Sequence, residues 1–152
     1  MCSTGGRGRA TVVTLVKNYV LQTGGAVDDT DRLAAARAMR RQVLGDAYVD
    51  GVTAETDPVA IEFQDFITSM AWGVWARGGP LSTRDRSLLV LSITLALGRM
   101  EEFELHLRAA PNAGVTDAEV DELLFQVTAY AGGPAGVAGR RVVRRVRGER
   151  TT

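Results

Sequence analysis

The amino-acid sequence predicts an all-α protein, a single-domain helical bundle of about six helices that follows an N-terminal arm. Apolar residues recur every three or four positions from Asp31 onward. Glycine, proline and capping residues divide this part of the chain into segments of helical length. The 152 residues, 45% of them hydrophobic, are enough for one core. We therefore expect residues 1–30 to form an arm or linker and residues 31–148 to form one helical domain.

The first helix is expected just after the arm. Within the arm, residues 11–21 are rich in β-branched side chains and could form a short strand or a docked arm, and residues 23–30 are typical of a linker. Helical spacing then covers residues 31–44 and stops at Gly45, a residue that commonly ends helices. The sequence predicts a loop at 45–57.

Two capping patterns mark the next two helices. Asp57 N-caps a helix with Pro58 at its first position, where a missing N–H costs least. Ser82, followed three residues later by Asp85, resembles a capping box. The helix that it opens is apolar almost all round through Leu97, so we expect it to be the buried central element. The apolar face of the helix that begins at Pro58 consists of Val59, Ile61, Phe63, Phe66, Ile67, Met70, Trp72 and Trp75.

Three more helices complete the predicted bundle. One runs from about residue 100 to residue 110 and contains the only histidine. A capping box at Thr116 and Glu119 opens the next helix. The segment 132–136, "GGPAG", breaks the chain before a last helix at 137–147, and its lack of the P-loop lysine and hydroxyl excludes nucleotide binding. The inward side of the last helix is predicted to consist of Val142, Val143 and Val146.

Composition excludes several classes of function. Eighteen basic and eighteen acidic residues cancel, so no overall field attracts nucleic acid or an anionic membrane. Six arginines within 140–150 could contact either, but with no aromatic residues among them a solvated or oligomer-facing helix end is favoured. Cys2 alone cannot form a disulfide, a zinc cluster or a dithiol site within one chain. The longest apolar run, at 88–98, is too short to span a membrane, and we expect a cytoplasmic protein without a signal peptide.

A few side chains stand out as candidates for chemistry. Glu102 precedes His106 by one helical turn, and a carboxylate in that position can raise the basicity of an imidazole. From spacing alone, a satisfied core histidine is the favoured interpretation, with a general acid or base as the alternative. Arg86 could clamp a carboxylate, whereas Arg84 is expected to form an ion pair or to be solvated. Trp72, with Trp75, could be a core or interface anchor or a platform for substrate.

Four blocks in order resemble the γ-carboxymuconolactone decarboxylase family. They are "RRQVLGDAYVD" (40–50), "FQDFITSMAWGVWARGG" (63–79), the long segment 84–126 that includes "LHLRAAPNAG", and "YAGGPAG" (130–136). The resemblance implies an all-α fold of the alkylhydroperoxidase-like superfamily that oligomerises through its helices, commonly as trimers or hexamers. It also implies loss of CO₂ from 4-carboxymuconolactone to give the 3-oxoadipate enol-lactone, with no metal and no organic cofactor. The expected partners are a small carboxylated lactone and further copies of this chain.

The resemblance also assigns roles to individual residues. The reaction needs a proton donor for carbon, hydrogen-bond donors for the developing oxyanion, and cations for two carboxylates. His106 falls on the family's histidine, so the catalytic interpretation is now favoured, and Glu102 could orient it. Arg86 matches the family's arginine ahead of the buried helix and is the candidate for binding a substrate carboxylate. Tyr48, where the family usually has histidine, and Trp72 are further candidates for substrate binding.

The departures from the family pattern leave three functions open. Ala131, Gly133 and Val137 replace the family's cysteine, valine and asparagine, so the predicted pocket is smaller and less polar. Arg99 and Glu102 occupy the positions of the Cys-x-x-Cys of the peroxidase branch, which excludes thiol peroxidase chemistry. The first hypothesis is the family's decarboxylase. The second is an enzyme on the same scaffold that has diverged to another substrate in secondary metabolism, and the third is a non-catalytic oligomeric binding protein.

Overall fold

The computed structural model describes residues 29–54 and 56–150, so the predictions made for residues 1–28 lie outside it. Within those ranges the structure contains only helices and no strand, which confirms the all-α prediction. The described residues form seven helical segments, one more than predicted, and a short 3₁₀ turn, η2 (Ala110–Ala113). In order they are α2 (Asp29–Leu44), α3 (Asp46–Thr53), the continuous run of α4 (Pro58–Ile67), η1 (Thr68–Trp72) and α5 (Gly73–Ala76), α6 (Thr83–Ala96), α7 (Met100–Ala109), α8 (Asp117–Ala131) and α9 (Gly133–Arg150).

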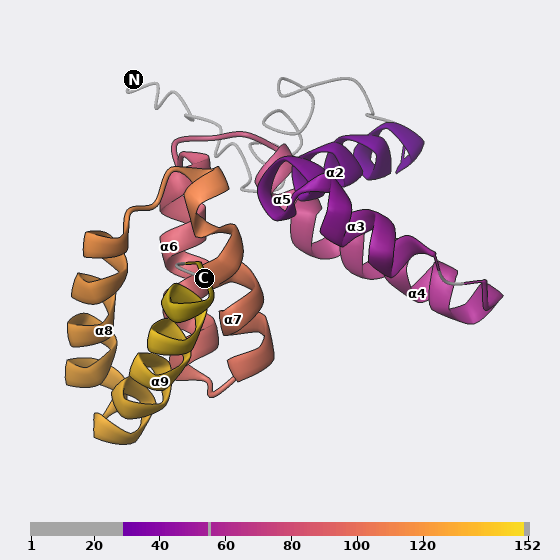
Figure 1. Ribbon diagram of the computed structural model, residues 1–152. Helices are drawn as coiled ribbons and strands as arrows, with labels where there is room; N and C mark the ends of the chain where they lie inside the picture. The colour runs from indigo at the N-terminus through magenta and orange to yellow at the C-terminus, as the bar shows by residue number, and fades with distance from the viewer. Residues whose placement is uncertain (1–28, 55, 151–152) are drawn as a thin grey trace, which may run out of the picture.

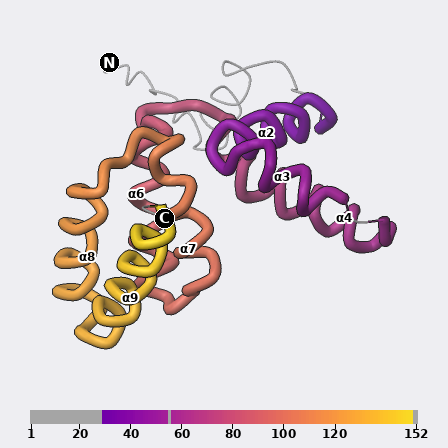
Figure 2. The backbone as a smooth tube through the Cα atoms, viewed as in Figure 1, coloured from indigo at the N-terminus to yellow at the C-terminus, as the bar shows by residue number. Residues whose placement is uncertain are grey.

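The helices form two groups that meet at α2 and α7 (Figures 1 and 2). Helices α6 to α9 pack around a core of leucine, valine and phenylalanine side chains centred on Phe103, Leu91 and Leu95, none of which is exposed. Helices α2 and α5 and the η1 segment pack around a second core. That second core contains Trp72 and Trp75, and Ala109 of α7 and Ala113 of η2 also contribute to it. The second core therefore joins the two groups.

The capping signals in the sequence are confirmed at three helix starts. The Asp57 side chain accepts a hydrogen bond from the backbone N–H of Ala60, with Pro58 at the first helical position. Ser82 and Thr116 each form a reciprocal capping box with the acidic residue three positions later. Each of these bonds satisfies backbone donors that have no partner within their own helix.

The predicted loop at 45–57 is wrong in its first part, because residues 46–53 form α3. This helix has no side-chain N-cap, and Gly45 before it has a φ of 86°, which favours glycine. Contacts with α2 hold it instead, since Arg41 forms ion pairs with Asp46 at 3.1 Å and with Asp50 at 2.7 Å. Val49 is 4% exposed and anchors the helix on the protein. These contacts leave no local signal in the sequence.

The prediction that α6 is buried on all sides is also wrong for the single chain. Leu91 and Leu95 are fully buried, but Leu89, Ile93 and Leu97 form an exposed stripe at four-residue spacing. Much of the apolar face predicted for the preceding helix is exposed as well, although Trp72 and Trp75 are buried. Helix α4 extends away from the α6–α9 group, so that group does not cover it (Figure 1). The exposed apolar residues of α4, η1 and α5 are Val59, Ile61, Phe63, Phe66, Met70 and Val74.

The last helix starts earlier than predicted. Only Gly132 interrupts the chain, with a φ of 96°, and α9 already begins at Gly133, so the break expected over the whole of 132–136 is wrong. Pro134 is compatible with this start because the first turn of a helix needs no backbone N–H partner there. The inward side of α9 is confirmed, since Val142, Val143 and Val146 are all buried. No helix in the described part of the chain is long and apolar enough to cross a membrane.

Candidate functional site

The imidazole of His106 lies against the two tryptophans at the junction of the helix groups. Its ring centroid is 5.8 Å from that of Trp72 and 6.3 Å from that of Trp75, with interplanar angles of 24° and 22°. The two indoles in turn contact each other, with centroids 5.1 Å apart. Trp72 and Trp75 come from one helical run and His106 from α7, so the tertiary fold builds this aromatic cluster. Both indoles belong to a hydrophobic core, and a substrate-binding role for Trp72 stays a prediction.

Burial determines the electrostatics of His106. The Nδ1 atom is buried and has no hydrogen-bond partner, although the residue as a whole is only partly buried. Loss of solvation lowers the pKa of the imidazole from its ordinary value of 6.5, and the negative charge of Glu102 opposes this shift more weakly. The ring is therefore neutral at pH 7. A neutral imidazole carries one N–H donor and one acceptor, so it can both bind and transfer a proton.

Glu102 acts on His106 through charge. It is exposed, and in the described structure no hydrogen bond joins its carboxylate to the imidazole, so the expected orienting contact is not formed there. Glu102 and Tyr48 line the same open hollow of about 390 Å³ between α3 and α7. The fold thus brings together two candidates that are far apart in the sequence. His106 lines neither this hollow nor the larger pocket described below.

The Arg86 side chain is hydrogen-bonded to the backbone of the chain segment before α6. It is 9% exposed, and its two terminal nitrogens donate to the carbonyl oxygens of Val74, at 3.0 Å, and Gly78, at 2.6 Å. Val74 lies in the last turn of the helical run before α6, where helix geometry leaves carbonyl acceptors without partners, and Gly78 lies just beyond its end. The contacts favour a structural role for Arg86, and its binding of substrate stays a prediction. Arg84 forms ion pairs with Asp85 and Glu119. This agrees with one of the two expectations from the sequence, namely that Arg84 forms an ion pair.

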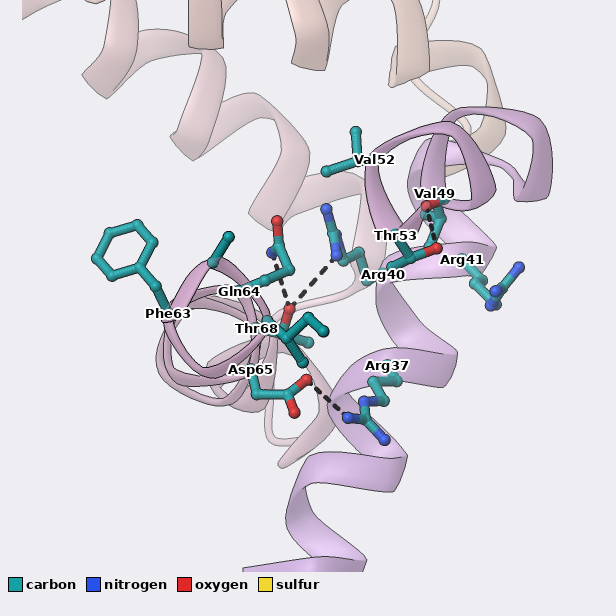
Figure 3. Close-up of a pocket in the computed structure, with 12 residues that line it drawn as sticks. Arg37, Arg40, Arg41, Val49, Val52, Thr53, Phe63, Gln64, Asp65 and Thr68 are labelled. Carbon is teal, nitrogen blue, oxygen red and sulfur yellow. Dashed lines mark hydrogen bonds and ion pairs between the residues drawn. The ribbon is translucent and has the colours of Figure 1, made fainter. Parts of the chain in front are cut away.

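A second pocket, larger than the hollow beside Tyr48, contains an arginine that the sequence did not single out. It measures about 580 Å³ and lies between α2, α3 and the α4–η1 run. Arg40 projects into it from α2, close to Thr68 and Gln64 (Figure 3). The sequence "MRRQVLG" gives no indication of which arginine is buried, since that depends on the helices packed against α2. Within residues 29–54 and 56–150 no three histidine, cysteine or acidic side chains gather as a metal site.

Comparison with known proteins identifies the relatives of this chain. The family model described as "Carboxymuconolactone decarboxylase family" matches residues 62–145. A 4-carboxymuconolactone decarboxylase of Acinetobacter baylyi is 38% identical over 121 residues, which cover 79% of this chain and 90% of the relative. A nitrosuccinic acid decarboxylase of Metarhizium robertsii is 38% identical over 98 residues, or 64% of this chain and 68% of the relative. His106, both tryptophans and the capping box of α8 all lie within the matched segment. The chain belongs to the carboxymuconolactone decarboxylase family.

Proposed function

We propose that this protein is a cofactor-independent decarboxylase of a small carboxylated lactone, 4-carboxymuconolactone or a close analogue. The observation that carries the proposal is the Nδ1 atom of His106, which is buried without a partner beside two indole rings. Unpaired buried polar atoms are rare in folded proteins, and one of the recognised reasons for them is a catalytic role. The relative from Acinetobacter, named for this reaction, supports the choice of substrate.

The environment of His106 suits the delivery of a proton to carbon. As the bond to the departing carboxylate breaks, CO₂ leaves and the electron pair moves into the lactone carbonyl. The neighbouring imidazole experiences this new negative charge, which raises its lowered pKa and favours a proton on the ring. The ring takes up a proton from solvent as this charge develops, gives it to the carbon and returns to its neutral form, so that one proton is consumed for each CO₂ released. In this proposal the Trp72 ring holds the imidazole in place, while Tyr48 supplies a hydrogen-bond donor from the hollow that Glu102 also lines.

The proposal is tested by release of CO₂ from purified protein supplied with 4-carboxymuconolactone. Replacement of His106 by glutamine keeps a polar side chain of similar size but removes the titrating group. We expect kcat to fall by about 10²- to 10⁴-fold, the usual contribution of general acid–base catalysis. Glu101→Gln is the control, because it also places a glutamine on α7 but leaves His106 in position. Glu101 is one residue further from His106 along the sequence than Glu102 is. Full activity in His106→Gln would remove the imidazole from the mechanism.

A second candidate function is the decarboxylation of a different organic acid on the same scaffold. The relative from Metarhizium, named for nitrosuccinic acid, has the same percentage identity to this chain as the relative from Acinetobacter. The two relatives therefore do not discriminate between the substrates. Parallel assays of CO₂ release from both acids decide between them through the ratio of their kcat/KM values. A folded protein that binds these acids but releases no CO₂ from either would instead be a binding protein.

We also propose that the chain assembles into a homo-oligomer through its helices. Two exposed apolar stripes support this, one along α4, η1 and α5 and the other on α6 at Leu89, Ile93 and Leu97. Contiguous exposed apolar surfaces of this kind are uncommon on monomers and mark association sites. We expect sedimentation analysis to give a mass several times 16.3 kDa, and Ile93→Glu on α6 to reduce it. A wild-type mass of one chain at micromolar concentration contradicts the assembly.

A further inference from the structure

We propose that the pocket between α2, α3 and the α4–η1 run binds the carboxylate group of a small organic acid, with Arg40 as the cation that holds it. This pocket measures about 580 Å³, within the usual range for sites that bind small molecules. None of the residues chosen from the sequence as candidates for the site lines it. Figure 3 shows Arg37 and Arg40 reaching from α2 toward Asp65 and Thr68, whereas the Arg41 side chain points away from them.

The three arginines of the pocket differ in whether their charge is already neutralised. Arg37 forms an ion pair of 2.6 Å with Asp65. Arg41 forms ion pairs with two aspartates of α3. Arg40 is the most buried of the three, at 7% exposure, yet within residues 29–54 and 56–150 it has no carboxylate partner. A buried charge is usually paired, so Arg40 is the position in this pocket where an anion would be stabilised most.

The hydrogen bonds of Arg40 leave most of its donors free. Its single hydrogen bond to the protein runs from Nη1 to the hydroxyl oxygen of Thr68 and is long, at 3.5 Å. Gln64 donates to the same oxygen at 3.3 Å, so the ends of Arg40 and Gln64 lie close together (Figure 3). Burial lowers the pKa of the guanidinium from its ordinary value, yet arginine keeps its proton at neutral pH. A guanidinium carries five N–H donors in a planar fork, which matches the two oxygens of a carboxylate.

The walls of the pocket indicate which kind of anion fits. Val49, Val52 and Ile61 provide an apolar surface that suits a hydrocarbon skeleton. Only one of the three cations is unpaired, which favours a singly charged group such as a carboxylate over a phosphate with two charges. The neighbouring carboxylate of Asp65 also disfavours a second negative charge at the same point. We therefore infer an aliphatic or lactone carboxylate rather than a phosphorylated ligand.

The pocket lies close to the aromatic cluster around His106. Thr68, which contacts Arg40, precedes Trp72 by four residues, so the two are about one helical turn apart, roughly 5 Å along the axis. Helix α2 contributes Arg40 to the pocket and Val43 to the core around Trp72. An acid held at Arg40 is for this reason a candidate for the substrate of the proposed decarboxylase. That link rests on the proposed function, whereas carboxylate binding at Arg40 does not.

Calorimetric titration of the full chain with adipate tests the binding site. Adipate is an unreactive dicarboxylate, and adipamide is its uncharged counterpart. We expect adipate to bind and adipamide to show no binding. Arg40→Met, which removes the charge, is expected to weaken adipate binding by about tenfold to 100-fold, and Arg40→Lys, which keeps a charge without the fork, by less. Arg32→Met is the matched control, because Arg32 lies on the same helix, is largely exposed and does not line the pocket.

The outcomes separate this inference from the proposed function. Unchanged adipate affinity in Arg40→Met and Arg40→Lys overturns the inference, as does a wild-type protein that does not bind adipate. Should Arg40→Met fail to fold by circular dichroism, the affinity of Arg40→Lys relative to Arg32→Met decides. Arg40-dependent binding of adipate without release of CO₂ from either acid supports the site and contradicts the decarboxylase. Decarboxylation with an unaltered KM in Arg40→Met supports the enzyme and contradicts the assignment of its substrate to this pocket.

Discussion

Gly139 lies where helices approach each other closely, and replacing this glycine by alanine gives a prediction with a definite magnitude. Gly139 is buried on α9, where that helix crosses α6 and α8. A methyl group at this position would lie 2.7 Å from one terminal carbon of Leu95 and 2.9 Å from one of Leu124. Carbon atoms in packed cores are separated by about 3.5–4.0 Å, so both leucines have to move. Leu95 is fully buried and has little room to do so.

The expected loss of stability in Gly139→Ala follows from two opposing contributions. Extra methyl groups in a well-packed core cost about 1–3 kcal/mol in the free energy of unfolding. Alanine recovers up to about 1 kcal/mol of this because glycine is a poor helix former. Gly148→Ala on the same helix isolates the second contribution, since nothing lies within 4 Å of a methyl group there. We expect Gly139→Ala to be less stable than Gly148→Ala by about 1–3 kcal/mol, the packing contribution alone.

Urea unfolding followed by circular dichroism measures this difference. Both variants need the same protein concentration as the wild type, because assembly makes apparent stability depend on concentration. Equal m-values are required before the free energies are compared. Equal stability of the two variants, or a more stable Gly139→Ala, would refute the inferred close approach of α9 to α6 and α8.

Three further predictions concern His106, Thr116 and Arg86. The pKa of His106 in the folded protein is lowered below 6.5, so the unfolded chain binds the proton more readily than the folded chain. We therefore expect the wild type to lose stability relative to His106→Gln as the pH falls below about 6.5. Urea unfolding of both proteins at about pH 7.5 and about pH 5.5 measures this difference. Thr116→Ala removes the N-cap of α8 and is expected to lower the free energy of unfolding by about 0.5–2 kcal/mol, whereas no change would mean that the capping box contributes nothing. Arg86→Met removes two donors from the carbonyls of Val74 and Gly78 and is expected to cost about 1.5–3 kcal/mol in urea unfolding, with KM unchanged. A raised KM at unaltered stability would instead assign Arg86 to the substrate.

The sequence by itself determined the features that depend on neighbouring residues. A capping box joins residues three positions apart, so the starts of α6 and α8 are visible in the chain at Ser82 and Thr116. Asp57 and Pro58 define the start of α4 in the same way. The four sequence blocks also identified the family and singled out His106, because the order and spacing of many residues together are more specific than any single contact. What the sequence determined was therefore the class of the fold, the family and most of the helices, and it also indicated the residue that we propose for the chemistry.

Only the tertiary structure decided which side chains are paired and which are left free. Arg40 and Arg41 are adjacent in the sequence, yet one is buried beside Thr68 and the other forms ion pairs with α3. Arg86, which is expected to bind substrate, also donates to the backbone carbonyls of Val74 and Gly78, contacts that no sequence pattern indicated. Helix α3 was missed for a related reason, since contacts with α2 rather than a local cap hold it. Burial and pairing depend on segments that are distant along the chain, and a pattern of local spacing carries no record of them.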